Sequence, residues 1–311
     1  DYESFRSVVQ QFAVNEIVPN IPEWEEAGEV SRELYKKAAS VGIFGDGFDE
    51  EYGGHGQRDA IVRMIILKEL SMAGSVGVVA SILSNYIGLP PIKRSGSKEM
   101  KSRVLIPCLA GEAVAALAIT EPSGGSDVAR IQTTAKRDGE EFIVNGQKTF
   151  ITSGMNANFF TVAVRTGDQG ARGISLLLIE GDRPGLERTR LDKMGWLSSD
   201  TATLYFDDIR VPTTNLIGEE NTGFSSIVNN FNAERIDMAS QSIAFSRACY
   251  NDALDWSRNR ETFGKRLADH QVIRHKFIEM DRQINAAQAW CELLSWRLNQ
   301  GDNLSLIHIS E

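Results

Sequence analysis

Residues 113–127 read Ala-Val-Ala-Ala-Leu-Ala-Ile-Thr-Glu-Pro-Ser-Gly-Gly-Ser-Asp, and the hydrophobic periodicity of the chain changes at this stretch. A short apolar run is followed by Pro122 and a Ser-Gly-Gly-Ser turn, a pattern that predicts a strand ending in a tight turn. Such a turn gathers backbone N–H groups and hydroxyls without bulky side chains, as phosphate-binding turns do. A plain connection between two elements has the same composition. The stretch is not a Rossmann fingerprint, because no G-x-G-x-x-G opens a helix.

The part of the chain that precedes this stretch has a helical pattern. Through residues 3–93, apolar side chains recur at spacings of three and four, as in residues 5–12 and 61–70, which is typical of amphipathic helices. Residues 42–56 interrupt the pattern with six glycines. So many glycines predict a long shaped loop rather than a helix, and loops of this length often line functional sites.

The part that follows the stretch carries strand signals. Asn145-Gly146 lies between two runs rich in β-branched and aromatic residues, 141–144 and 147–152. This dipeptide favours a two-residue hairpin turn. Further strand candidates, separated by Gly, Pro and Asp, are residues 159–165, 173–180 and 201–211. The middle third of the chain is therefore predicted to be a β domain.

Helical periodicity then returns through residues 224–258 and 271–298. The order of helices, strands and helices favours segregated layers over an alternating βαβ fold. The predicted fold class is α+β with several domains. These are an N-terminal helical domain (1–112), a middle β-barrel or sandwich domain (113–220) and a C-terminal helical bundle (221–311) that is expected to be incomplete.

Composition excludes several classes of function. The net charge is −9 and the 33 Lys and Arg residues are scattered, which argues against a nucleic-acid partner. Three widely spaced cysteines suggest reduced thiols, and four unclustered histidines suggest no metal site. No apolar stretch reaches the roughly 20 residues that cross a bilayer, and no secretory leader opens the chain. We therefore expect no membrane insertion and a location in a bacterial cytoplasm or an organelle matrix.

Two later segments are ambiguous when each is taken alone. Within residues 147–154, Phe150 and Thr152 lie two positions apart, so that both would point to one side of a strand. A flavin ring could lie against such a pair. Residues 258–271 form a polar, glycine-containing break between two long helices. A plain hairpin strand and a solvated loop between helices would explain the two segments equally well.

Taken in order, these pieces resemble the acyl-CoA dehydrogenase family over residues 1 to about 303. The matching pieces are Glu51-Tyr-Gly-Gly54, residues 119–127, residues 145–152, Met194-Gly195 with Ser199-Asp200-Thr201, residues 206–212 and residues 260–264. The resemblance implies the same order of helical, β and helical domains, an FAD cofactor and an acyl-CoA substrate.

The resemblance also implies which residues form the cofactor site. Residues 117–126 match the segment that contacts the flavin and its pyrophosphate, and residues 150–152 match the strand beside the isoalloxazine ring. Many members carry Trp where this chain has Phe150, which keeps an aromatic surface but lacks the indole N–H. Residues 260–271 match a segment that reaches the FAD of a neighbouring subunit, which implies a homo-oligomer, a dimer or a tetramer. The predicted cofactor-binding residues are Leu117, Ile119, Thr120, Gly125, Ser126, Phe150, Ile151, Thr152, Arg260, Thr262, Phe263, His270 and Gln271.

The implied reaction removes two hydrogens across the Cα–Cβ bond of an acyl thioester. A carboxylate takes the α proton, and the β hydrogen passes as hydride to flavin N5. In most members the base comes from the C-terminal segment, but an isovaleryl- and long-chain-type subgroup places it where this chain has Glu234. A Glu beside an Arg on a helix is otherwise typical of a solvated face. The predicted base is Glu234, and the predicted substrate-binding residues are Ser126, Asn232, Ala233, Glu234 and Arg235.

Two alternatives stand beside a dehydrogenase that passes electrons to electron-transfer flavoprotein. One is an acyl-CoA oxidase that uses O2, and the other is a catalytically silent family member acting as a binding or assembly partner. Residues 304–311 do not resemble the family and match the translation of a common transposase sequencing adapter. We therefore expect this tail to be foreign and the chain to be truncated.

Overall fold

The computed structural model describes residues 2–302 and residue 304, so the predicted foreign tail lies outside the described residues except for Leu304. Its contacts divide the chain into two compact units. The helical unit comprises Asp1–Pro19, Arg58–Val76 and Asn232–Glu311, and the sheet unit comprises Asn20–Gln57 and Gly77–Phe231. The predicted division into three domains along the sequence stays a prediction.

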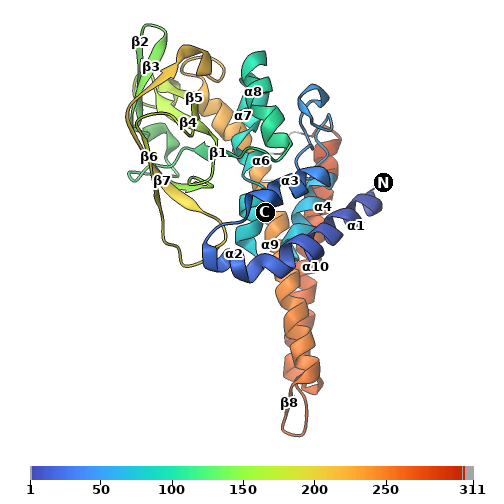
Figure 1. Ribbon diagram of the computed structural model, residues 1–311. Coiled ribbons are helices and arrows are strands. Elements are labelled where there is room, and N and C mark those ends of the chain that lie inside the picture. Colours follow the sequence, from blue (N-terminus) through green and yellow to red (C-terminus); the bar gives the residue numbers. More distant parts are fainter. Residues whose placement is uncertain (1, 303, 305–311) are drawn as a thin grey trace. The chain divides into compact units, whose positions relative to one another are not determined.

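The sheet unit is built on seven strands (Figure 1). The strands are β1 (Ala115–Ala118), β2 (Thr134–Asp138), β3 (Glu141–Thr152), β4 (Phe159–Arg165), β5 (Ile174–Glu180), β6 (Leu186–Arg190) and β7 (Thr201–Pro212). They lie in the order β1-β4-β2-β3-β7-β6, and β5 pairs with β4. The β1–β4 and β2–β4 pairs are parallel, and the other pairs are antiparallel. The predicted β domain is thus a mixed sheet.

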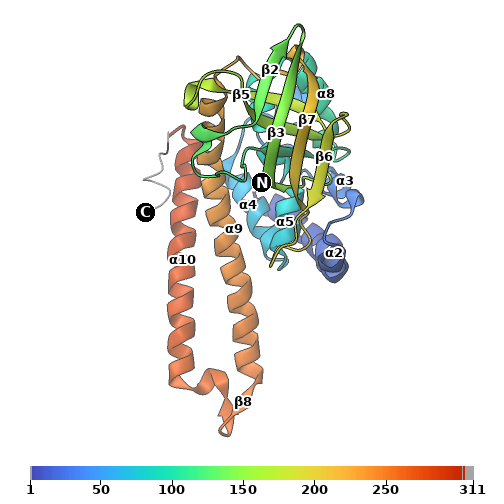
Figure 2. The ribbon, with the colours of Figure 1, turned by 90° about the vertical axis from the view of Figure 1, so that its left-hand side faces the viewer.

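The apolar content of the strands explains which of them lie in the core of the unit. β4 and β5 are buried almost throughout, because their residues are apolar or β-branched at consecutive positions. β6 is mostly exposed and lies at the edge of the sheet beside β7 (Figure 2). Phe142, Phe160 and Leu204 are among the side chains that fill the sheet core.

Six helices of this unit accompany the sheet. They are α2 (Ile21–Ala27), α3 (Arg32–Ser40), α5 (Val76–Ile82), α6 (Asn85–Gly88), α7 (Pro90–Ser95) and α8 (Lys98–Leu109). The buried Asn85 joins them to β1, because its amide donates to Cys108 O at 3.1 Å and accepts from Ala115 N at 2.7 Å. A Cβ at Gly88 would stand 2.8 Å from the carbonyl carbon of Ala115, so α6 approaches β1 this closely only with glycine.

The glycine-rich loop of residues 42–56 is ordered by its apolar side chains. Phe44, Phe48 and Tyr52 are buried, and η3 (Glu50–Tyr52) forms one short turn within the loop. A Cβ at Gly54 would lie 2.0 Å from Phe48 O. The loop is therefore shaped by close backbone contacts, as its composition predicted.

The predicted hairpin turn at Asn145-Gly146 is wrong. β3 runs continuously through these residues, and the turn lies at residues 139–140, where Asp138 pairs with Glu141. Asn145 and Gly146 instead form a register shift against β7. There the Asn145 amide bonds Asp208, and a Cβ at Gly146 would lie 2.7 Å from Thr133 Cα. Local propensity predicted a turn at this dipeptide. Its structure is determined instead by the cross-strand contact of Asn145 with Asp208 and by the close approach of Thr133 to Gly146.

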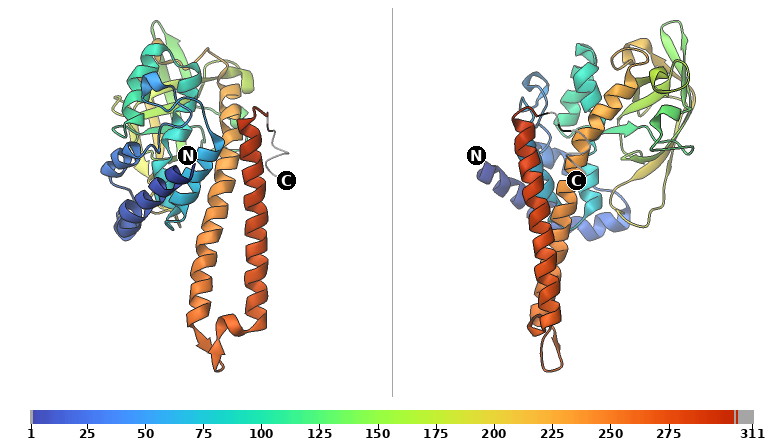
Figure 3. Two further views of the ribbon diagram at one scale, coloured as in Figure 1. Left: turned by 90° about the vertical axis from the view of Figure 1, so that its right-hand side faces the viewer. Right: turned by 180° about the vertical axis from the view of Figure 1, so that it is seen from behind.

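The helical unit consists mainly of α1 (Tyr2–Phe12), α4 (Ala60–Ser71), most of α9 (Gly223–Asn259) and α10 (Gln271–Asn299). α9 and α10 lie side by side and antiparallel, and the short β8 (Glu261–Thr262) and β9 (Lys265–Arg266) connect them (Figures 2 and 3). Both long helices match the sequence prediction to within one residue at each end.

Polar pairs and a small apolar cluster hold the helices of this unit together. Arg247 on α9 bonds Asp281 on α10 at 2.6 Å, and Ile236 packs with Leu294 and Leu304. Asn299 caps α4, because its side-chain oxygen accepts from Ala60 N at 2.8 Å. Within the part of the chain that the structure describes, no helix is long and apolar enough to cross a membrane.

Candidate active site

The Ser-Gly-Gly-Ser turn begins at the end of β1. Glu121 and Gly124 exchange two backbone hydrogen bonds, of 3.1 and 3.0 Å, and so close a tight turn. Gly125 and Ser126 are exposed, and Thr120 is half-buried behind them. A Cβ at Gly125 would stand 3.4 Å from Thr120 Cγ2. The turn thus offers backbone and hydroxyl groups on an open surface, which is what a phosphate-bearing cofactor needs.

The second predicted segment lies on β3, next to a β-bulge between Lys148 and Ile151. Phe150 has a φ of +58° and is 70% exposed, whereas Ile151 is buried and Thr152 is half-buried. A positive φ in an aromatic residue is costly and is often found at functional sites. Because the bulge interrupts the alternation of the strand, the prediction that Phe150 and Thr152 share one side does not follow from strand periodicity.

The structure brings these two segments together. Thr149 N donates to Thr120 O at 2.9 Å, which joins the end of β1 to the bulge of β3. An exposed aromatic ring, hydroxyl side chains and a glycine turn therefore lie on neighbouring segments. This set fits a flat ring system that carries a polar, phosphorylated tail, as FAD does.

A buried ion pair lies beneath the same segments. Lys148 Nζ is 2.8 Å from Glu121 Oε1 and donates to Ile119 O at 2.9 Å. Burial lowers the pKa of Lys148 to about 8, although Glu121 opposes this shift. Burial acts to raise the pKa of Glu121, but Lys148 and the hydrogen bonds to the carboxylate outweigh it, so this pKa lies below its ordinary value. Glu121 lies in residues 119–127 and Lys148 in residues 145–152, two of the stretches that resemble the family, but no role was predicted for either residue from the sequence.

The third predicted segment forms the connection between α9 and α10. Phe263 has a φ of +52° and is 99% exposed, and its ring lies edge-on to the ring of His270. His270 Nε2 is 3.4 Å from Thr262 Oγ1. Arg260 and Gln271 are exposed on either side. The structure therefore gathers the five predicted residues of this segment at one tip of the helical hairpin.

Glu234 lies on α9 in the helical unit and is half-buried rather than solvated. Burial and the like charge of Asp237 raise the pKa of Glu234 to about 7, against the opposing effects of Arg63 and Arg235. Asp237 is itself bonded to the buried Arg63 at 3.1 Å. A carboxyl group with such a pKa can take up a proton near neutral pH, which a general base must do. The side chains of Asn232 and Ala233 lie outside the described part of the structure.

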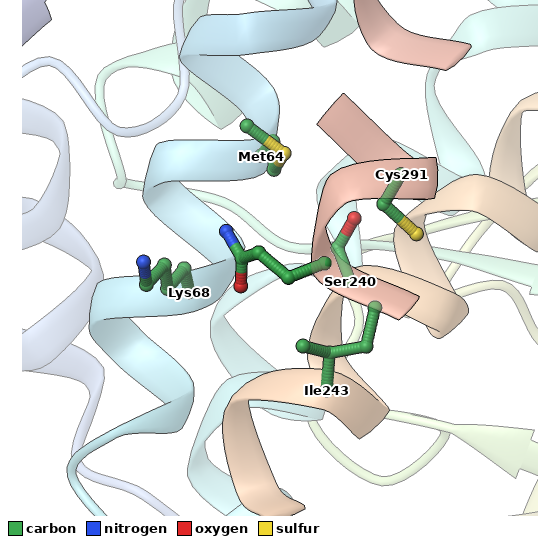
Figure 4. Close-up of a pocket in the computed structure, with 6 residues that line it drawn as sticks. Met64, Lys68, Ser240, Ile243 and Cys291 are labelled. Carbon is green, nitrogen blue, oxygen red and sulfur yellow. The ribbon is translucent and has the colours of Figure 1, made fainter. Parts of the chain in front are cut away.

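Two cavities of the molecule contain no residue of the predicted site. One, of about 10 Å³, lies among α4, α9 and α10 and has room for about one water molecule (Figure 4). It is lined by Met64, Lys68, Ser240, Ile243, Gln288 and Cys291. Burial raises the pKa of the Cys291 thiol there.

The other cavity, of about 410 Å³, is in the sheet unit, and Arg32 and Arg188, which help to line it, are bonded to backbone carbonyls. Within the described residues, no group of three or more His, Cys, Asp or Glu could hold a metal ion.

Comparison with known proteins identifies the family of the chain. The N-terminal, middle and C-terminal domain models of acyl-CoA dehydrogenases match residues 1–112, 116–209 and 221–308. The mitochondrial long-chain specific acyl-CoA dehydrogenase of Sus scrofa is 35% identical, and the match covers 94% of this chain and 68% of that protein.

Two solved structures extend the comparison. A probable acyl-CoA dehydrogenase from Mycobacterium abscessus is 44% identical with a TM-score of 0.94, and the match covers 97% of this chain and 80% of that one. A glutaryl-CoA dehydrogenase from Mycobacterium smegmatis, solved in complex with FADH2, is 26% identical with a TM-score of 0.92, covering 100% of this chain and 78% of that one. The chain belongs to the acyl-CoA dehydrogenase family of flavoproteins, oxidoreductases that act on CH–CH bonds.

Proposed function

We propose that this protein is an FAD-dependent dehydrogenase that oxidises the Cα–Cβ bond of an acyl-CoA thioester with Glu234 as the base. The observation that carries the proposal is the state of Glu234, a half-buried carboxyl group whose pKa is raised to about 7. A solvated helical Glu, the alternative weighed from the sequence, would keep a pKa near its ordinary value. FAD, when bound, accepts the hydrogen that leaves the β carbon as a hydride.

The chain's own residues supply binding, orientation and proton transfer. Thr120, Gly125 and Ser126 would make the polar contacts to the flavin and its pyrophosphate, and Phe150 would lie against the flavin ring, with Ile151 and Thr152 beside it. Glu234 takes the α proton at a carboxylate oxygen. Asn232, Ala233, Arg235 and Ser126 are proposed to surround the acyl-CoA. The same helix thus positions both the base and the thioester.

The tip of the helical hairpin supports a working homo-oligomer. Phe263 is almost fully exposed, and Trp256 on α9 and Ile278 on α10 are each 66% exposed. Large exposed apolar side chains of this kind often mark surfaces that another subunit covers. We propose that Arg260, Thr262, Phe263, His270 and Gln271 reach the FAD of a neighbouring subunit, and that a dimer or tetramer is the active form.

The test is anaerobic mixing of the purified protein with acyl-CoAs of different chain lengths while the flavin absorbance is recorded. We expect bleaching with at least one acyl-CoA and recovery when electron-transfer flavoprotein is added. Rapid recovery in air alone would instead identify an oxidase. A flavin-loaded protein that no acyl-CoA bleaches would be the silent binding partner.

The rate of flavin reduction should depend on pH through Glu234. The base acts only when it is deprotonated, and burial raises its pKa to about 7. Below pH 7 the rate is therefore expected to fall about tenfold for each pH unit, and above pH 7 it should level off. Stopped-flow absorbance between pH 5.5 and 9 measures this profile.

The variant Asp237→Asn tests the cause of the shift. Asp237 raises the pKa of Glu234, and Arg63 lowers it. Removing the negative charge of Asp237 should therefore move the profile to lower pH. A profile that keeps its midpoint in this variant would contradict the assignment of Glu234 as the titrating base.

A further inference from the structure

The buried pair Lys148–Glu121 ties together three separate pieces of the proposed flavin site. Lys148 Nζ, on β3, contacts Glu121 Oε1 at 2.8 Å and Ile119 O at 2.9 Å, just beyond β1. The Glu121 carboxylate in turn accepts from Gln132 N at 2.6 Å and from Thr133 N at 2.9 Å. Lys148 is 0% exposed. The pair therefore fastens the end of β1, the segment before β2 and the bulge of β3 at one point.

Stability alone does not account for this pair. Burying two charges costs several kcal/mol per ion, and well-packed apolar residues of similar volume are often as stable or more stable. The neighbouring sheet core is built from such residues. A lysine at this place therefore suggests a role for its charge.

The placement of the charge indicates what that role is. Ile119 C=O and the N–H of Thr120 belong to one peptide unit. An ammonium group that bonds the carbonyl draws electron density from the peptide, and hydrogen-bond chains strengthen one another in this way. The N–H of Thr120 thereby becomes a stronger donor. The next peptide unit is also held, because Thr120 O accepts a hydrogen bond from Thr149 N at 2.9 Å.

We propose that Lys148 is a positioning residue whose ammonium group, through the Ile119–Thr120 peptide, favours the electron-rich reduced flavin over the oxidised flavin. The inference rests on the proposed function, in which Thr120 contacts the flavin. Glu121 moderates the effect, because its carboxylate neutralises part of the charge of Lys148. The negative charge of Glu121 is in turn stabilised by hydrogen bonds from the N–H groups of Gln132 and Thr133.

Two variants should shift the reduction potential of the bound flavin in opposite directions. In Lys148→Met/Glu121→Gln the pair is replaced by two uncharged side chains of similar size. The preference for reduced over oxidised flavin should fall about tenfold, which lowers the potential by about 30 mV for a two-electron couple. In Glu121→Gln alone the lysine keeps its charge and loses the carboxylate, so the potential should rise.

The potential is measured by anaerobic reduction against a reference dye, and substrate turnover plays no part in it. Lys136→Met, a change at an exposed lysine on β2, is the matched control. Thermal unfolding and flavin content are recorded for each variant. If only the single variant Glu121→Gln folds, its reduction potential decides: a rise supports the inference, and a fall contradicts it.

Two results would overturn the inference. The first is a potential equal to that of the control in both variants. The second is loss of fold or flavin in both variants while the control is intact, which would make the pair purely structural. A wild-type protein that binds no FAD would instead overturn the proposed function, so the two failures are distinguishable.

Discussion

Replacement of Glu234 by glutamine is expected to slow flavin reduction by about 10²–10⁴-fold, which is the usual contribution of a positioned general base. Gln has nearly the same shape as Glu but cannot accept the α proton. Glu234 is not among the residues proposed to contact FAD, and Thr120 and Phe150 belong to the other unit of the chain, so FAD binding should be retained. Stopped-flow absorbance after anaerobic mixing with the best acyl-CoA substrate measures the rate, and the flavin spectrum measures occupancy.

The matched control is Asp252→Asn, which removes an exposed carboxylate from the same helix, α9. Its rate should equal that of the wild-type protein. If Glu234→Gln reduces its flavin as fast as this control does, the base must be another group. The mechanism proposed from α9 would then be wrong.

Replacement of Lys148 by methionine alone is expected to lower the free energy of unfolding by about 3–5 kcal/mol, because removal of one partner of a buried pair leaves an uncompensated buried charge. That charge would be the carboxylate of Glu121, which is 5% exposed. The loss should also loosen the contact between the end of β1 and β3, so FAD should bind less tightly. Denaturant unfolding and titration of the apoprotein with FAD measure the two effects.

Two comparisons show whether the loss of stability comes from the unpaired carboxylate of Glu121 or would follow the replacement of any lysine. Lys136→Met on β2 should change the free energy of unfolding by no more than about 0.5 kcal/mol, as is usual at exposed positions. Adding Glu121→Gln to Lys148→Met should restore part of the stability, since it removes the unpaired carboxylate. A double variant less stable than Lys148→Met would contradict the assignment of a buried, unpaired charge.

The sequence predicted those elements whose buried residues form a regular pattern along the chain. β4 coincides with the predicted strand at residues 159–165, because residues 159–164 are all apolar or β-branched. α9 and α10 were predicted for the corresponding reason, a helical period sustained through residues 224–258 and 271–298, and the helices are 37 and 29 residues long. β6 was missed, since Leu-Glu-Arg-Thr-Arg has no buried face and only its pairing with β7 makes it a strand.

Local patterns failed where a contact distant in the sequence decided the backbone. Asn145-Gly146 has the composition of a hairpin turn, but it lies in the middle of a strand, where Asn145 is hydrogen-bonded to Asp208 and the backbone of Thr133 approaches Gly146 closely. Phe150 was expected to follow strand alternation, and the bulge of β3 gives it a positive φ instead. Propensity describes a residue among its chain neighbours, and these positions depend on residues on other strands.

The sequence by itself determined the family, the order of helical and β segments, and the identity of the base and flavin motifs as candidates, because these are encoded in ordered local strings of residues. Only the tertiary structure decided that Glu234 is half-buried with a raised pKa, and that Lys148 lies against Glu121 and Ile119. Desolvation and ion pairing depend on which groups surround a side chain in space. Lys148 and Glu121 are 27 residues apart in the chain, and no periodicity connects them.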